Sequence, residues 1–210
     1  MDTRRVLPLS GVAFVVLALV AVIGLGGETP SNDASPAEIL SFYDAHTVRQ
    51  GIAAFVFALS VPFLVFFGVS LASSLWTESA DRQPVWQCVC IGGSVLAGAG
   101  LLIAAWVHFS LADGADNKVA AEALQGLNTL DSNAWMAWNA GFGVMLLGAA
   151  GCMIARTRAH QWMGWAALIL GIALFIPFAD FFALILTLLW IIVASVMLFR
   201  GSISLSTAVR

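Results

Sequence analysis

Long apolar runs separated by polar connectors dominate the chain. Six of these runs contain no Asp, Glu, Lys or Arg. A transmembrane helix needs about 20 mainly apolar residues, because each residue rises about 1.5 Å and the hydrocarbon core is about 30 Å thick. The pattern therefore predicts an all-α polytopic membrane bundle, a single domain over residues 1–210 with six transmembrane helices. Their expected ranges are 6–26, 51–76, 85–112, 134–155, 162–179 and 181–199.

The last two runs are separated only by Asp180. A single helix through both would hold this carboxylate in mid-membrane, at a cost of about 2.5 to 3.5 kcal/mol or more. Pro177 also favours a turn at this point. We therefore expect two helices, with Asp180 at the outer membrane edge as the N-cap of the second. A ligand-binding role for Asp180 is the alternative.

The first run could also be a secretory signal peptide, because Arg4 and Arg5 precede it. Its apolar stretch exceeds the usual 7 to 15 residues, and no A-x-A-like cleavage site follows. A retained transmembrane helix is therefore expected.

Charge predicts the orientation of these helices. Only 10% of the residues are charged and 60% are hydrophobic. With alternating helices, seven arginines fall on the side of the N-terminus, and only Arg49 and Lys118 fall on the other. The excess of Lys and Arg in cytoplasmic loops predicts cytoplasmic N- and C-termini in the plasma membrane. The outer face then carries two basic and nine acidic residues, a formal charge of −7.

Two outer connectors are long enough to contain helices. The segment 27–50 includes Ser35-Pro36-Ala37-Glu38, a capping box with proline at the first helical position. We expect a short helix from here that lies on the outer surface, ahead of the second transmembrane helix. The segment 113–133 contains a second short helix candidate over 118–124, with Gly and Asn marking the turns.

Small residues recur at helical spacing in two of the predicted helices. Gly93, Ala97, Gly100 and Ala104 form one stripe, and Gly164, Ala167 and Gly171 form another. Such stripes mark close helix contacts in membranes, within or between subunits. Pro62 should kink the second predicted helix. Seven of the eight tryptophans lie near a predicted helix end, and Trp190 is the exception. Tryptophan rings favour the interface between membrane and water, where helix ends lie.

Titratable side chains are absent from the centres of the six runs, which disfavours an ion-coupled pump. The three histidines do not share a depth, which disfavours a transmembrane haem. His46 and His108 could meet on the outer face with Asp44 to hold a divalent cation, although no tight ligand spacing supports this. Asn139 is a polar residue at membrane depth, expected to bond to a neighbouring helix or to a ligand. No cofactor is expected.

Several short sequence segments in the chain resemble those of multispan membrane proteins of actinobacterial type that belong to domains of unknown function. The residues that carry the resemblance are 35–39 and 43–46 before the second helix, 161–165 at the start of the fifth, and 188–192 in the sixth. This resemblance implies a six-helix fold. It supplies no activity and no functional residues.

Three functions remain open, and the sequence disfavours an enzyme because no catalytic, phosphate-binding or nucleic-acid-binding motif is present. The first is a non-enzymatic accessory component, which would bind a lipid or apolar ligand through its outer half or associate with another membrane protein. The second is an uncoupled permease or channel, as a single chain or a homo-oligomer, in which the acidic outer face would concentrate cations near a pore mouth. The third is an outer-facing metal-dependent enzyme. Asp180, Asn139, Asp44, His46 and His108 are the candidate ligand-binding residues.

Overall fold

The computed structural model describes residues 6–75, 85–156 and 161–201. Within these ranges every regular element is a helix, as the apolar runs predict. The elements are η1 (Leu7–Leu9), α2 (Ser10–Leu19), η2 (Val20–Gly26), α3 (Pro36–Ser74), α4 (Val85–Asp116), α5 (Ala121–Asn133), α6 (Trp135–Arg156), α7 (Gln161–Ala173) and α8 (Asp180–Phe199).

Five helical stretches of the described chain are long and apolar enough to cross a membrane. Their ranges are Leu7–Gly26, Pro36–Ser74, Val85–Asp116, Ala121–Ile154 and Asp180–Phe199. Helix α7, with 13 residues, is too short to qualify. The protein is therefore an apolar helical bundle of membrane type. The crossing expected over 162–179, the fifth of the six predicted, stays a prediction.

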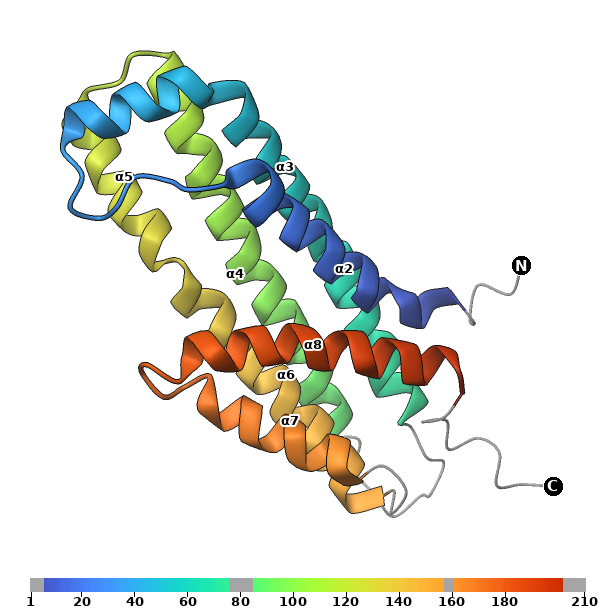
Figure 1. Ribbon diagram of the computed structural model, residues 1–210. Coiled ribbons are helices and arrows are strands. Elements are labelled where there is room, and N and C mark those ends of the chain that lie inside the picture. Colours follow the sequence, from blue (N-terminus) through green and yellow to red (C-terminus); the bar gives the residue numbers. More distant parts are fainter. Residues whose placement is uncertain (1–5, 76–84, 157–160, 202–210) are drawn as a thin grey trace.

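Helices α2, α3, α4 and α6 form the body of the bundle (Figure 1). Helices α3 and α4 lie side by side, and α4 packs against α6 on its other flank. Helix α8 runs obliquely across the bundle in Figure 1, and it contacts α2 and α7. The end of α8 and η1 contact each other, so both lie at the same end of the bundle.

Both small-residue stripes form contacts within the chain. A Cβ atom placed on Gly100 would lie 2.7 Å from the carbonyl carbon of Ala137 and the backbone nitrogen of Trp138. One placed on Gly171 would lie 3.2 Å from the carbonyl oxygen of Gly143. Helix α6 is therefore held between α4 and α7 at backbone distance, which side chains larger than hydrogen would prevent.

Helix α3 begins where the capping box predicts. The backbone N–H of Glu38 donates to the Ser35 hydroxyl at 3.3 Å, and Pro36 is the first helical residue. The helix then continues to Ser74, so the expected surface helix and the second predicted span are one helix with a bend. The bend lies at His46 (φ −124°, ψ 16°), the only residue of α3 with non-helical dihedrals. The dihedrals at Pro62 are helical, and the kink expected there stays a prediction.

Side chains compete with the backbone at this bend. His46 Nδ1 lies 2.8 Å from the carbonyl oxygen of Phe42, and the Thr47 hydroxyl donates to the carbonyl of Tyr43 at 2.8 Å. These carbonyls, four residues back, are the normal acceptors of the helix backbone. Because side chains bond to these carbonyl oxygens, they compete with the regular backbone hydrogen bonds of the helix, which gives a local reason for the bend.

The segment 113–133 differs from its expected form. Helix α4 continues to Asp116, and α5 begins only at Ala121 and extends to Asn133. Lys118, expected inside the short helix, adopts φ 55° in the turn between them. Burial of apolar side chains explains the longer helices, because Ile39, Leu111 and Leu124 pack with Tyr43 in a small core of their own.

Trp190, the tryptophan expected in mid-helix, joins α8 to α7. Its side chain is buried, and its indole N–H donates to the carbonyl of Met163 at 3.1 Å. We expect Trp190→Phe to lower the free energy of unfolding by about 1 kcal/mol, because the ring volume is largely kept and one interhelical hydrogen bond is lost. Thermal unfolding in detergent measures this. Trp165→Phe, at an exposed position of α7, is the control, and an equal loss there would contradict the role of the hydrogen bond.

Candidate functional site

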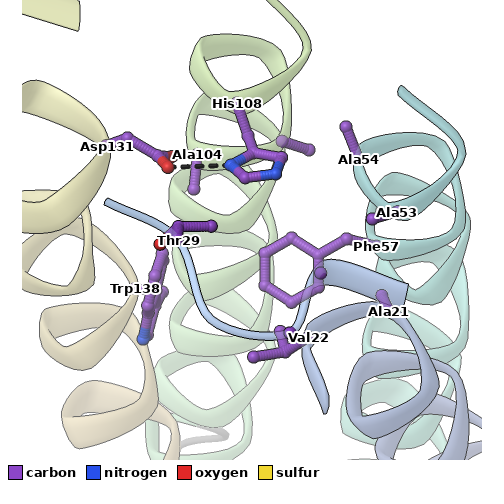
Figure 2. A pocket seen from close by; sticks show the side chains of 13 residues that line it. Ala21, Val22, Thr29, Ala53, Ala54, Phe57, Ala104, His108, Asp131 and Trp138 are labelled. Carbon is purple, nitrogen blue, oxygen red and sulfur yellow. Dashed lines mark hydrogen bonds and ion pairs between the residues drawn. The ribbon is translucent and has the colours of Figure 1, made fainter. Parts of the chain in front are cut away.

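A pocket of about 240 Å³ lies between the N-terminal segment and helices α3, α4, α5 and α6 (Figure 2). One end of the pocket is polar and its walls are apolar. The lining residues are Ala21, Val22, Gly26, Gly27, Thr29, Ala53, Ala54, Phe57, Ala104, Ala105, His108, Asp131 and Trp138.

His108 organises the polar end of the pocket. Its Nδ1 lies 2.8 Å from Asp131 Oδ2, and its Nε2 lies 2.9 Å from Gln50 Oε1. The Gln50 amide nitrogen donates to the carbonyl of Gly26 at 2.9 Å, which fixes the amide with its oxygen toward the imidazole. Both ring nitrogens therefore lie within hydrogen-bond distance of a side-chain oxygen.

The N-terminal segment reaches this network through an irregular helix. Residues Val20–Gly26 form a π-helix, and Gly27 follows with φ 64°. The positive φ is one that glycine adopts without steric cost, and it turns the chain out of the helix. The carbonyl of Gly26 is left to accept from Gln50 and, at 3.4 Å, from Arg49. Short π-helical segments of this kind often lie at functional sites.

Small side chains keep the pocket open below its polar end. Five alanines line it, from the N-terminal segment, α3 and α4. The rings of Phe57 and Trp138 meet edge to face, with centroids 6.1 Å apart. Figure 2 shows these two rings below the pair of His108 and Asp131, with Thr29 beside them. The pocket can therefore hold an apolar group with a polar or hydrogen-bonding head toward His108, Asp131 and Thr29.

Of the five candidate ligand-binding residues that the sequence predicts, only His108 lines this pocket. Asp180 and Asn139 come together elsewhere, where the Asn139 amide nitrogen lies 3.5 Å from Asp180 Oδ2. The expected N-cap role of Asp180 is wrong. Ala179 is the N-cap of α8, and Asp180 is its first helical residue.

Asp44 and His46 have partners outside the pocket. Asp44 forms an exposed ion pair with Lys118, and His46 bonds to the carbonyl of Phe42 in its own helix. Among the described residues, no group of three or more His, Cys, Asp or Glu side chains is arranged to hold a metal ion. The suggested joint site of His46, His108 and Asp44 therefore has no ligand set in the described structure.

Gln50, Asp131 and Thr29 are site residues that the sequence did not single out. Gln50 and His108 are 58 residues apart, and Asp131 is 23 residues beyond His108. Gln50 is a polar residue next to the apolar run of α3, and this position is the one signal that could have pointed to it.

Comparisons of the chain with family models, with curated proteins and with solved structures gave no match. The resemblance drawn from the sequence stays an expectation. The pocket and its polar end are the basis for the functional argument.

Proposed function

We propose that this protein is a non-enzymatic membrane component that binds a lipid-like or apolar ligand in the pocket below His108. The observation that carries the proposal is the joining of alanine-lined walls to a hydrogen-bonded polar end in one pocket. Such a pocket matches a ligand with an apolar body and a polar head.

The proposed setting is the plasma membrane, with both termini in the cytoplasm. The seven arginines on that side of the predicted topology support this orientation. Helix α5 and the first part of α3, up to the bend at His46, then lie at the outer face. Helices α7 and α8 form a pair that starts and ends on the cytoplasmic side, so the placement of the C-terminus does not depend on how deeply that pair inserts.

The size of the pocket limits which ligands can fit inside it. A volume of about 240 Å³ is below the roughly 300 to 1,000 Å³ of pockets that enclose drug-sized molecules. We therefore expect the end of one chain or a compact apolar molecule inside, with the rest of a larger lipid extending through the opening. Asp131 and Thr29 would accept or share hydrogen bonds with the ligand head.

Filling the pocket should abolish this binding. Ala104 is 4% exposed and lines the pocket, so Ala104→Leu places a larger side chain where the ligand would lie. We expect saturable photolabelling by a diazirine-bearing long-chain fatty acid to fall at least tenfold in this variant. Peptide mapping by mass spectrometry would find the label on peptides that contain Phe57 or Trp138.

Ala99→Leu is the matched control, because Ala99 is an exposed position on the same helix. It should leave the labelling of the pocket peptides unchanged. Thermal unfolding of both variants separates a blocked pocket from a damaged fold. Equal labelling of the pocket peptides in the folded Ala104→Leu variant, or labelling confined to lipid-facing peptides in the wild type, would overturn the proposal.

A further inference from the structure

The turn between α7 and α8 is unusual in its composition. Residues 174–179 read Leu-Phe-Ile-Pro-Phe-Ala, without a single polar side chain. Turns in water favour Gly, Asn, Asp and Ser beside proline. Phe178 is 93% exposed, and Phe181 and Phe182 at the start of α8 are each more than 60% exposed. This end of the hairpin therefore presents aromatic rings to its surroundings.

Phe178 also occupies a backbone position that a bulky residue rarely adopts. Its φ is 72°, and the backbone N–H of Ala179 donates to the carbonyl of Ile176 at 3.1 Å. With Pro177 at the second position, these are the features of a type II turn, in which Gly or Asn normally takes the place of Phe178. In water, an exposed phenylalanine at this position would be unfavourable in conformation and in solvation. In hydrocarbon its ring is well solvated.

Most of the N–H groups in the turn donate to carbonyls of the turn itself or of the end of α7. The N–H groups of Phe175, Ile176 and Asp180 donate to the carbonyls of Ile172, Ala173 and Ile176, at 3.0 to 3.1 Å. Pro177 has no N–H group to satisfy. Because lipid offers no hydrogen-bond partners, internal bonds of this kind lower the cost of placing a turn within the bilayer.

The contacts of the turn place it well below the polar outer end of the bundle. The Asp180 carboxylate lies beside the side chain of Asn139 in α6. The preceding residue in α6, Trp138, has its backbone nitrogen close to Gly100 of α4. His108 lies eight residues further along α4, about 12 Å at 1.5 Å per residue. Helix α7 is only about 20 Å long by the same rise, and α8 runs obliquely to α3 and α4 (Figure 1). Neither helix of the pair therefore carries the turn to the level of His108.

We propose that α7 and α8 form a re-entrant hairpin, whose tip at Phe178 lies in the hydrocarbon of the bilayer and contacts lipid chains. Both ends of the hairpin are on one side of the membrane. Asp180, half-buried, is turned to Asn139 inside the bundle, as a carboxylate at membrane depth requires. The aromatic tip is the lipid-contacting surface, and this inference does not depend on a ligand in the pocket.

Cysteine accessibility tests this placement in the full-length protein in cells. The variants are Phe178→Cys at the tip and Gly126→Cys on α5, where Gly126 has open space around it, with the unsubstituted chain as the blank. A membrane-impermeant maleimide is applied to intact cells and to inside-out vesicles. We expect Gly126→Cys to react in the preparation that exposes α5, and Phe178→Cys to react at least tenfold more slowly in both preparations. After denaturation in detergent, both variants should react fully.

Reaction of Phe178→Cys at the rate of Gly126→Cys in the same preparation would overturn the proposal, because the tip would then reach the outer water. Fast reaction in the opposite preparation would overturn it as well. A nitroxide attached at position 178 separates lipid from protein as the surrounding medium. High accessibility to oxygen with low accessibility to a polar nickel complex supports lipid contact. Low accessibility to both, or a disulfide-linked dimer of the variant, would show that a second copy covers the tip.

Discussion

Replacing Gly93 by leucine should prevent the protein from folding stably, with a loss of about 3 kcal/mol or more in the free energy of unfolding. A Cβ atom on Gly93 would meet the backbone nitrogen and Cα atom of Met145 in α6. Backbone atoms cannot move aside as the end of a flexible side chain can, so α4 and α6 would have to separate. The separation would also disturb the contact of Gly141 with Ala97 further along the same interface.

Gly92→Leu is a sharp control for this prediction. Gly92 is the neighbouring residue on the same helix, is exposed, and has no atom within 4 Å of its Cβ position. Both variants lose one glycine from α4, so helix propensity changes alike in the two. Thermal unfolding in detergent, with the fraction of monodisperse protein, should separate them clearly. Similar stability of the two variants would contradict the close packing of α4 against α6.

His108→Leu should cost about 2 to 3 kcal/mol, because it leaves two polar partners without their hydrogen bonds. Gln50 is fully buried, and the Asp131 side chain is 19% exposed, so water replaces the lost partner only in part. The loss should also loosen the N-terminal segment, which Gln50 ties to α3 through the carbonyl of Gly26. Chemical unfolding in detergent measures the stability, and hydrogen exchange of residues 20–30 measures the loosening.

A double-mutant cycle isolates this interaction. Asp131→Leu and His108→Leu should be strongly non-additive, with the double variant losing less than the sum of the single losses by 1 kcal/mol or more, as expected for a close pair. Phe109→Leu, at the neighbouring and exposed position of α4, should have little effect. Additive losses within about 0.5 kcal/mol would show that His108 and Asp131 do not act as a pair.

Much of the fold could be predicted from the sequence because bilayer thickness and helix rise set the length of apolar runs. The start of α3 could be predicted from its capping box, and a close helix contact along α4 from its small residues, although not that α6 makes this contact. A turn at Pro177 could be predicted as well, but the earlier end of α7 at Ala173 could not, because residues 174–176 are all apolar and carry no turn signal. The bend at His46 could not either, since it depends on side-chain bonds to carbonyls of the same helix.

The site could be predicted only in part. The position of His108 at the outer end of an apolar run identified it as a candidate. Its partners Gln50 and Asp131 come from other helices, and the distance between such residues depends on tertiary packing that no local pattern encodes. Asp180 was predicted as a helix cap from its place before an apolar run. Tertiary packing instead brings its carboxylate beside Asn139.

The central claim is that the pocket below His108 holds a lipid-like or apolar ligand. The most direct test is native mass spectrometry of the protein released from its surrounding membrane, for the wild type, Ala104→Leu and Ala99→Leu. We expect one apolar molecule to remain bound to each chain of the wild type and of Ala99→Leu, and to be lost from folded Ala104→Leu. A wild type without a bound molecule, or the same bound mass in all three proteins, would contradict the claim.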